Sequence, residues 1–366
     1  MSYNLENIFF NFRVQGSFKS GKPYGSGHIN DTFLVITNEN DKPDYIFQRI
    51  NHHIFKNVPK LQDNILRVTS HLRKKLEQTP EANPDRETLT LIPAIDGKPY
   101  YKDEEGSYWR IYIFIDNNHS YDLVETPAQA YEGGKAFGRF QYLLSDLEGE
   151  PLFETILNFH NMDMRLETFF QTVKRDPQKR VALAGPEIKF VEERAGEMTK
   201  ILRLGEAGKI PQRITHNDTK FNNVLLDEND KRLCVIDLDT VMPGYVHYDF
   251  GDSIRTTTNT ANEDEKDLSK VEMDIHLFEA YSKGFLEETK SFLTPMEIDN
   301  LAFSGKMMTF IIGLRFITDY IDGDNYFKIH HEHHNLQRAK AQFKLISSME
   351  RQFSQMEDII KKLNLS

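Results

Sequence analysis

The spacing of hydrophobic and polar positions changes along the chain and divides it into two regions. Between Phe12 and Asp116, short segments rich in β-branched and aromatic residues are typical of strands. We expect these strands over residues 32–37, 45–47 and 108–114. One helix interrupts them, because apolar residues from Val58 to Leu72 recur at helical spacing and Pro80 follows.

From about Thr126 onward, the apolar residues recur with the periodicity of amphipathic helices. We expect helices over residues 127–147, 164–175, 186–204, 266–289, 295–320 and 335–363. The segment around residues 214–239 is the clear β-like stretch among them. This order predicts an α+β fold with a small β-rich N-terminal lobe over residues 1–115 and a larger helical C-terminal lobe over residues 116–366, with a hinge near Ile115–Asn118.

The composition agrees with a folded protein of two lobes. A chain of 366 residues is long for one small core, and 39% hydrophobic with 28% charged residues is typical of a soluble globular protein. The net charge of −11 argues against a nucleic-acid-binding protein, which would carry a basic surface. The single cysteine, Cys234, lies in apolar surroundings that predict a buried structural thiol.

We expect neither a membrane span nor a secretory signal. No apolar run approaches the roughly 20 residues that a helix needs to cross a bilayer. The segment from Met1 to Phe12 contains Glu6 and has no basic residues ahead of an apolar block, unlike a secretory signal. A cytoplasmic protein that binds no membrane is therefore the default expectation.

A short polar segment within the helical region is the strongest candidate for chemistry. His216, Asp218 and Asn223 form a His-x-Asp-x-x-x-x-Asn pattern, and Asp237 follows an apolar run at residues 233–236. Phosphoryl transfer from ATP needs a carboxylate near the acceptor hydroxyl and oxygen ligands that hold Mg²⁺ against the phosphates. This segment supplies all of these groups, so it indicates a phosphoryl-transfer site.

A glycine turn precedes the first long strand. Gly25, Ser26 and Gly27 form it, and glycines let backbone N–H groups approach an anion closely. We expect this turn to cover the phosphates of a nucleotide. Asn30 replaces the third glycine of the Gly-x-Gly-x-x-Gly pattern, and the lack of a Gly-x-x-x-x-Gly-Lys-Ser/Thr sequence argues against a P-loop kinase.

These motifs resemble those of the aminoglycoside phosphotransferase/choline kinase superfamily. The likeness rests on the His-x-Asp-x-x-x-x-Asn pattern, on Ile236-Asp237 and on the segment 244–249. Within the superfamily the chain is most similar to the N-acetylhexosamine 1-kinases, in residues 24–30, 215–220, 235–244 and 249–255. The resemblance covers nearly the whole chain and implies a protein-kinase-like fold. Its N-terminal lobe would cover the nucleotide, and its C-terminal lobe would hold the catalytic and substrate-binding residues.

The resemblance implies a role for each carboxylate and amide of the central segment. Asp218 would orient the acceptor hydroxyl and accept its proton, with Mg²⁺-bound ATP as the donor. Asn223 and Asp237 would ligate the metal. Asp239 would share a strand face with Asp237 if the strand continued, as a further metal ligand or as a support. Asp249 would anchor the catalytic loop.

The phosphate-binding part of the N-terminal lobe departs from the usual kinase pattern. Gln48 stands where kinases place a strand Lys or Arg, and Arg49 should face away because strand residues alternate. The helix over residues 59–75 lacks an obvious Glu partner, although Asp63 is present. Either Mg²⁺ and backbone donors hold the phosphates, or another cation does. The expected nucleotide-binding residues are Gly25, Ser26, Gly27, Gln48, Asn223 and Asp237.

The resemblance also implies an amino-sugar acceptor, N-acetylglucosamine or N-acetylgalactosamine, phosphorylated at its anomeric hydroxyl. Such a sugar needs carboxylates and Arg donors around its hydroxyls and an aromatic face for its ring. Asp252 and Arg255, three apart on an expected helix, have the alternative of pairing with each other. No protein partner is implied. The candidate sugar-binding residues are His28, Asp218, Asp252, Arg255, Arg315 and Tyr326.

Two other functions stay open. One is a kinase of the same superfamily that acts on choline, homoserine, methylthioribose or an aminoglycoside, with which a net charge of −11 is compatible. The other is a kinase-like binding protein without activity, against which the catalytic motif argues. The run His330–His334 lacks the His-Glu-x-x-His order of a metal site, and a solvated helix entry is the favoured interpretation.

Overall fold

The computed structural model of the chain describes residues 3–25 and 29–365, which form two compact units. The first unit comprises Met1–His119, Asp146–Leu157 and Leu225–Met242. The second comprises Ser120–Ser145, Asn158–Val224 and Pro243–Ser366. The expected division at residues 115 and 116 therefore differs in detail, because two later segments return to the first unit. The side-chain nitrogen of Asn64 donates to the carbonyl oxygens of Phe153 and Val241, one in each returning segment, at 2.8 and 3.1 Å.

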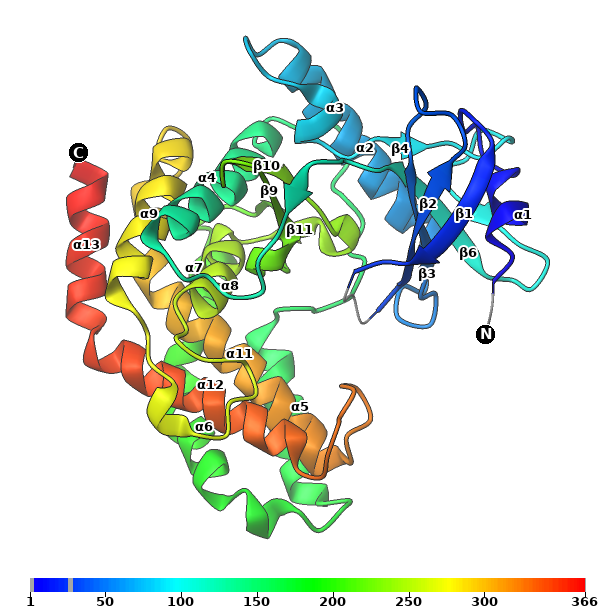
Figure 1. The fold of residues 1–366 in the computed structure, drawn as a ribbon. Helices are drawn as coiled ribbons and strands as arrows, with labels where there is room; N and C mark the ends of the chain where they lie inside the picture. The colour runs from blue at the N-terminus through cyan, green and yellow to red at the C-terminus, as the bar shows by residue number, and fades with distance from the viewer. Residues whose placement is uncertain (1–2, 26–28, 366) are drawn as a thin grey trace. The chain divides into compact units, whose positions relative to one another are not determined.

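An antiparallel sheet forms the centre of the first unit, with the strand order β1-β2-β3-β6-β4 and with β5 paired to β6 (Figure 1). The long strands β2, β3 and β6 confirm the three that the sequence predicts. The strands of this sheet are β1 (Phe18–Pro23), β2 (Asp31–Thr37), β3 (Tyr45–Ile50), β4 (Leu91–Ile92), β5 (Tyr101–Lys102) and β6 (Tyr108–Ile113). The helices of this unit are α1 (Leu5–Phe9), α2 (Val58–Glu77) and α3 (Pro84–Glu87).

The two faces of this sheet differ in chemistry. Phe47 and Ile111 are fully buried in an apolar cluster that also contains Phe9 of α1. Because side chains alternate along a strand, Gln48 and Arg110 point to the opposite face, where they lie directly across from each other in β3 and β6. One face therefore holds the core of the unit, and the other carries polar groups.

A second small sheet leads to the Asp237 turn. It consists of β7 (Asn118–His119), β9 (Val224–Asp227) and β10 (Arg232–Val235). Cys234 is buried in β10, and burial raises the pKa of its thiol to about 12, in agreement with a structural role. The strand ends at Val235, Asp237 has a left-handed φ of 61°, and the 3₁₀ turn η3 (Leu238–Thr240) follows. The condition under which Asp237 and Asp239 would share a strand face is therefore not met.

The second unit is mostly helical. Its strands are β8 (Arg213–Thr215) and β11 (Met242–Gly244), which pair. Its short 3₁₀ turns are η1 (Val181–Leu183), η2 (Phe221–Asn223) and η4 (Leu268–Lys270). Its helices are α4 (Pro127–Leu144), α5 (Met162–Arg175), α6 (Gly185–Met198), α7 (Lys200–Glu206), α8 (Val246–Thr257), α9 (Ile275–Thr289), α10 (Pro295–Ile298), α11 (Leu301–Asp322), α12 (His334–Arg351) and α13 (Phe353–Leu365).

The boundaries of four helices differ from those that the sequence predicts. The expected helices over residues 186–204, 295–320 and 335–363 are each divided in two. The expected helix over residues 266–289 begins only at Ile275, because the Asp274 carboxylate caps it by accepting the N–H groups of His276 and Leu277. Hydrophobic periodicity alone does not reveal such breaks, since apolar residues recur on both sides of them.

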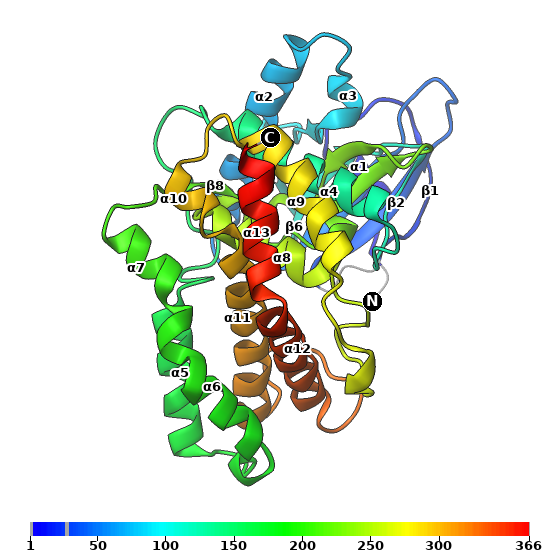
Figure 2. The same ribbon diagram turned by 90° about the vertical axis from the view of Figure 1, so that its left-hand side faces the viewer.

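Helix α11 lies at the centre of the second unit. It is 22 residues long, and an 18-residue window of it has a mean hydropathy of 1.3, which would suffice to cross a membrane by length and composition. The expectation that no apolar run approaches that length is therefore wrong for this segment. However, 83% of the window is buried, and α11 packs against α5, α8 and α12 (Figure 2). These are the properties of a core helix in a folded protein.

Helices α4 and α9 pack backbone against backbone in this unit (Figure 2). A Cβ atom on Gly134 would lie 2.2 Å from the carbonyl oxygen of Tyr281. A Cβ atom on Gly284 would lie 2.1 Å from the carbonyl oxygen of Tyr131. Only glycine leaves room for this contact, so the two helices cannot accept a side chain here without separating.

We expect Gly134→Ala to lower the free energy of unfolding by about 1–3 kcal/mol or more, because the new methyl group overpacks the α4–α9 contact. Gly196 in α6 provides the matched control, since no described heavy atom outside its own helix backbone lies within 4 Å of its Cβ position. There the same substitution should raise the free energy of unfolding by about 0.5–1 kcal/mol. Urea unfolding of both variants measures the difference, and effects of the same sign would contradict the close packing.

Candidate active site

A buried carboxylate of α8 holds the loop that follows β8. The two Asp249 carboxylate oxygens accept the backbone N–H groups of His216 and Asn217 at 2.8 and 2.7 Å. The side-chain nitrogen of Gln141 donates to the same carboxylate at 2.6 Å. Asp249 is fully buried, and burial raises the pKa of its carboxyl group although these donors oppose the rise. These hydrogen bonds to Asp249 therefore fix the loop conformation, including a φ of 65° at Asn217.

Asp218 is the next residue of this loop and is partly accessible. Its side chain is 29% exposed, and Oδ2 lies 3.3 Å from Lys220 Nζ and 3.4 Å from Asn223 Nδ2. Oδ1 has no hydrogen-bond partner in the part of the chain that the structure describes. Burial favours a higher pKa for Asp218, but the charges of Lys220 and His216 outweigh it and lower the pKa below its usual value. The carboxylate is therefore ionised at neutral pH, with one oxygen available to a hydroxyl.

Asn223 has an amide oxygen available beside Asp218. Its Nδ2 donates to the Asp218 carbonyl oxygen at 2.8 Å, which fixes the orientation of the amide. Its Oδ1 has no hydrogen bond within residues 3–25 and 29–365. An oriented amide oxygen next to a carboxylate is a suitable ligand for a hard cation.

Asp252 and Arg255 of α8 pair with each other, the alternative that the sequence leaves open. Arg255 contacts the Asp252 carboxylate at 2.9 Å and that of Glu263 at 2.7 Å. The other Asp252 oxygen accepts the backbone N–H of Thr219 at 3.1 Å. Both side chains are buried, and burial raises the pKa of Asp252 although Arg255 opposes the rise. The pair thus supports the residue directly after Asp218.

Two guanidinium groups lie near each other in the second unit, those of Arg165 and Arg315. Arg315 is stacked over the rings of Phe159 and Tyr326, at 5.1 and 5.4 Å, and its Nη2 donates to the Tyr326 hydroxyl at 3.3 Å. Arg165 donates to the Phe159 carbonyl oxygen at 2.8 Å. No described Asp or Glu forms an ion pair with Arg165 or Arg315. Burial, and then the charge of Arg315, lowers the pKa of Arg165 to about 10.

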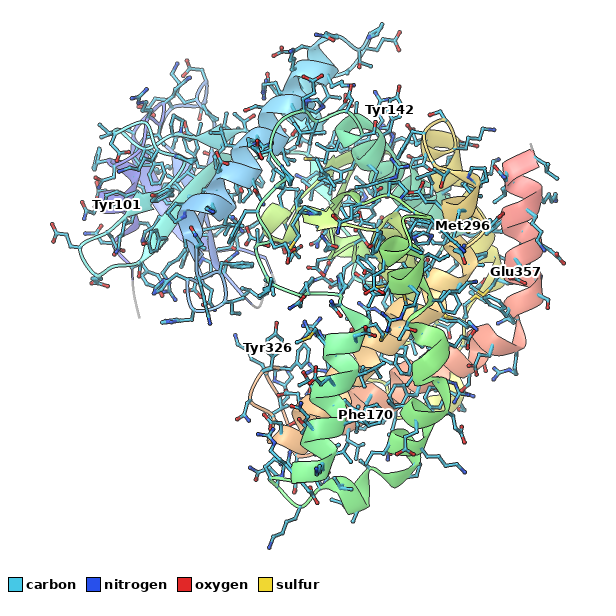
Figure 3. All side chains as sticks on the ribbon, turned by 180° about the vertical axis from the view of Figure 1, so that it is seen from behind. Tyr101, Tyr142, Phe170, Met296, Tyr326 and Glu357 are labelled. Atoms are coloured by element: carbon cyan, nitrogen blue, oxygen red, sulfur yellow. The ribbon has the colours of Figure 1, made fainter. Side chains whose placement is uncertain are left out.

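This arginine pair, Arg165 and Arg315, is connected to the catalytic loop through His160. The His160 ring nitrogen Nε2 lies 3.0 Å from the carbonyl oxygen of Asn217, the residue before Asp218. His160 is buried, and burial lowers the pKa of its imidazole to about 3. Tyr326 is 56% exposed, on the loop between α11 and α12 (Figure 3). The sequence analysis missed Arg165 and His160, because they belong to no motif and are 50 or more residues from Asp218 in the sequence.

Among the candidate nucleotide residues of the first unit, Gln48 has hydrogen-bond partners within that unit. Gly25 has a left-handed φ of 76°, whereas Ser26, Gly27 and His28 lie outside the described residues. Gln48 Nε2 donates to Thr32 Oγ1 at 3.1 Å, and Gln48 Oε1 accepts from Arg110 Nε at 2.9 Å. The sequence analysis missed Arg110, a buried cation beside the position where kinases place one. Only the pairing of β3 with β6 identifies it.

Arg49 pairs with Asp31 at 2.8 Å, on the face opposite to Gln48, as strand alternation predicts.

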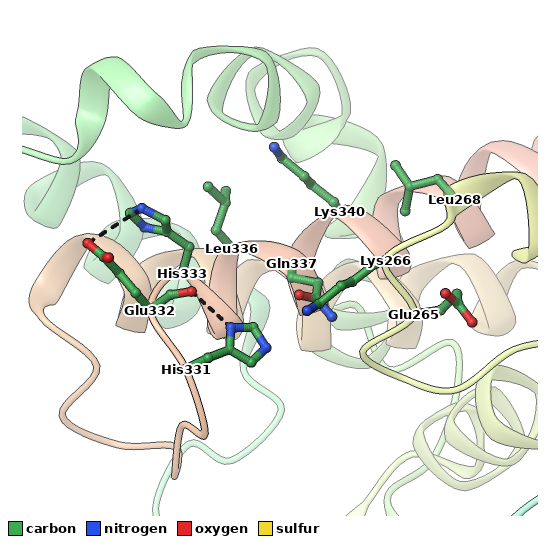
Figure 4. A pocket seen from close by; sticks show the side chains of 9 residues that line it. All are labelled: Glu265, Lys266, Leu268, His331, Glu332, His333, Leu336, Gln337 and Lys340. Carbon is green, nitrogen blue, oxygen red and sulfur yellow. Dashed lines mark hydrogen bonds and ion pairs between the residues drawn. The ribbon is translucent and has the colours of Figure 1, made fainter.

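The histidine run lines a pocket elsewhere in the second unit (Figure 4). His334 Nε2 lies 3.0 Å from the Asp264 carboxylate, and His333 Nδ1 lies 2.9 Å from the Tyr320 hydroxyl. Among the described residues, no three His, Cys, Asp or Glu side chains are arranged to hold a metal ion. Helix α12 begins at His334, one residue before the expected start. The residues that line the pocket are Glu265, Lys266, Leu268, His331, Glu332, His333, Leu336, Gln337 and Lys340.

Comparison with known proteins identifies the family. The phosphotransferase enzyme family profile, APH, matches residues 20–278, more than half of the chain, and this span includes the loop with Asp218 and Asn223. The chain belongs to the phosphotransferase enzyme family. The superfamily that the sequence motifs indicate is therefore confirmed for this phosphotransferase.

Solved structures share the fold of this phosphotransferase over nearly its whole length. A microcompartment-associated aminopropanol kinase has a TM-score of 0.59 and 13% identity, covering 96% of this chain and 98% of its own. A spectinomycin phosphotransferase, solved with ADP and spectinomycin, has 0.60 and 11%, covering 96% and 98%. A choline kinase from Cryptosporidium parvum Iowa II has 0.58 and 16%, covering 95% and 93%. The expected protein-kinase-like fold is thus confirmed.

His160 should make the stability of this phosphotransferase sensitive to acid. Its folded-state pKa of about 3 lies below the ordinary value of about 6.5, so the unfolded chain binds a proton that the folded protein does not. This contribution is fully present above pH 6.5 and is lost as the pH falls toward 3, by up to about 1.4 kcal/mol per pH unit.

We expect His160→Gln, which retains a donor for the Asn217 carbonyl oxygen, to reduce the loss of stability between pH 7 and pH 5 by about 2 kcal/mol. Urea unfolding of both proteins at the two pH values measures this difference. Parallel pH profiles would show that His160 is not buried in its neutral form.

Proposed function

We propose that this phosphotransferase transfers the γ-phosphoryl group of ATP to the anomeric hydroxyl of an N-acetylhexosamine and so forms a sugar 1-phosphate. The observation that carries the phosphoryl-transfer part is the Asp218 loop, which presents an ionised carboxylate with one oxygen available while Asp249 holds it from behind. Asp218 would accept a hydrogen bond from the acceptor hydroxyl, align its oxygen with the γ-phosphorus and take its proton as the new bond forms.

Each unit contributes one oxygen donor of the kind that binds a divalent metal ion. Asn223 contributes an oriented amide oxygen, and Asp237 contributes a carboxylate on a left-handed turn directly after β10. Both are the oxygen ligands that Mg²⁺ prefers. When bound, Mg²⁺ would neutralise charge on the ATP phosphates. We propose Asn223 and Asp237 as metal ligands, and Gly25, Ser26, Gly27 and Gln48 as neighbours of the phosphates.

The arginine pair favours an acceptor without positive charge. Choline and aminopropanol carry a cationic nitrogen, which the unpaired guanidinium groups of Arg165 and Arg315 would repel. The hydroxyl and acetamido oxygens of an N-acetylhexosamine can instead accept hydrogen bonds from them, and the exposed ring of Tyr326 can cover one sugar face. We propose Arg315 and Tyr326 as acceptor-binding residues, joined by Arg165. His28 keeps this role from the resemblance alone, as it lies outside the described residues.

For Asp252 and Arg255 we propose a supporting role in place of sugar binding. Their mutual ion pair and the Asp252–Thr219 hydrogen bond use the groups that a sugar would need. We propose that they orient the catalytic loop. A kinase of the same superfamily acting on another small hydroxyl compound is the second candidate, because the loop geometry serves any such acceptor equally well.

We expect ATP turnover with free N-acetylglucosamine or N-acetylgalactosamine and none with their 1-O-methyl glycosides, because the methyl group blocks the attacking hydroxyl. Coupled ADP detection over a panel that also contains choline, aminopropanol and an aminoglycoside measures this. Equal turnover of free sugars and glycosides would overturn the anomeric assignment. Turnover of the cationic compounds alone would favour the second candidate.

We expect Asp218→Asn to lower kcat by about two to four orders of magnitude, because the amide cannot accept the hydroxyl proton. The affinity for ADP should change little. Asp299→Asn, at an exposed position of the same unit, is the matched control and should retain full activity. Steady-state kinetics and calorimetric titration with ADP measure both effects, and substantial residual turnover by Asp218→Asn would exclude it as the base.

A further inference from the structure

A buried guanidinium lies on the polar face of the sheet in the first unit. Arg110 is 1% exposed and belongs to β6. Its Nη1 forms an ion pair with the Asp239 carboxylate, and its Nε donates to Gln48 Oε1 at 2.9 Å. Burial favours a lower pKa for Arg110, but Asp239 opposes it and the pKa ends above its usual value. Arg110 is therefore a permanent buried charge, and Asp239 is its counter-ion.

Helix α2 contributes a neutral partner to the same guanidinium. With its amide oriented so that nitrogen donates to the Pro99 carbonyl oxygen, Gln62 accepts from Arg110 Nη1 at 3.2 Å. Kinases commonly pair a strand Lys with a helix Glu at the corresponding positions. Here strand β3 and helix α2 both supply glutamines, Gln48 and Gln62. In this chain the cation belongs to β6 and its carboxylate to the η3 turn.

Asp239 has both of its oxygens committed within the first unit. Oδ1 pairs with Arg110, and Oδ2 accepts from Asn30 Nδ2 at 2.6 Å. Asp239 is only 3% exposed. As a direct metal ligand it would have to release one of these partners, and releasing Arg110 would leave an unpaired charge in the interior, which is strongly unfavourable.

Asn30 connects this carboxylate to the start of β2. It stands at the position of the missing third glycine, and its Oδ1 accepts the backbone N–H of Asn51 at 3.0 Å, just beyond β3. One amide thus joins three segments, the residue before β2, the end of β3 and the η3 turn. A glycine at this position could form none of these side-chain bonds.

We propose that Arg110, Asp239 and Asn30 form a positioning link that holds the start of β2 and the Asp237 turn in the arrangement needed to bind a nucleotide with its metal. Asp239 lies two residues after Asp237, so fixing its carboxylate fixes the η3 turn and the left-handed conformation of Asp237. Asp239 is accordingly a positioning residue and not a metal ligand. This inference rests on the proposed nucleotide-dependent function, but it is independent of the sugar acceptor.

Calorimetric titration with ADP, once with excess Mg²⁺ and once with EDTA, separates the two roles of Asp239. A positioning link holds the start of β2, which follows the proposed phosphate-binding turn in the sequence, as well as the turn with Asp237. We therefore expect Asp239→Asn to weaken binding of ADP about 10- to 100-fold in both titrations. Asp237→Asn is the matched control and should lower the affinity for ADP only in the titration with Mg²⁺. If Asp239→Asn lowered the affinity for ADP only in the presence of Mg²⁺, Asp239 would be a direct metal ligand and the proposal would be wrong.

The exchange variant Asn30→Asp/Asp239→Asn provides the second test. In Asp239→Asn alone, two amide nitrogens can face each other and Arg110 loses its counter-ion. In Asn30→Asp alone, two carboxylates meet. The exchange again opposes an amide to a carboxylate and keeps one negative charge in the pair of residues 30 and 239.

We expect the exchange variant to recover ADP affinity with Mg²⁺ to within about threefold of the natural protein, and to recover most of the thermal midpoint that each single variant loses. Recovery of the thermal midpoint without affinity would reduce the link to a structural role and overturn the proposal. Failure of the natural protein to bind ADP would refute the nucleotide-dependent function itself, whereas normal binding by Asp239→Asn would refute the link alone.

Discussion

The loop that carries Asp218 depends on one carboxylate that has no access to solvent. Removing the Asp249 charge from water is costly, and it is compensated only while the N–H groups of His216 and Asn217 point at it. The backbone, in turn, adopts a left-handed conformation at Asn217 that would not persist without those bonds. The buried charge and the loop conformation therefore stabilise each other. A reacting carboxylate can then remain partly exposed without losing its position.

The first unit also contains a buried carboxylate that holds a turn, but its partners are side chains. Asp239 is buried against the Arg110 guanidinium and the Asn30 amide, rather than against backbone N–H groups. In both units a carboxylate with all its bonds inside the protein lies close in space or sequence to one proposed for chemistry, Asp218 or Asp237. Groups that hold the site and groups that would react are thus separate residues with opposite exposure requirements.

The sequence was sufficient for what local patterns determine and insufficient for what strand pairing and helix packing determine. The motif around Asp218 predicted the superfamily, and alternation in β3 placed Gln48 and Arg49 on opposite faces. Arg110 was missed because only the register of β3 against β6 brings it beside Gln48. Arg165 was missed because a single arginine on a helix has no local signal, and its lack of a carboxylate partner is a property of the packed unit. The metal, nucleotide and acceptor roles stay predictions.

The arginine pair has a consequence for how this protein can change over time. Arg165 and Arg315 lie near each other and have no carboxylate partner among the described residues, so their charges repel each other. The lowered pKa of Arg165 reflects part of this repulsion. Replacing Arg165 by a neutral residue of similar shape would relieve that repulsion. If the proposed acceptor site uses Arg165, selection for a more stable fold and selection for acceptor binding act in opposite directions at this position. An arginine at this position would therefore be retained only if the proposed acceptor site requires it.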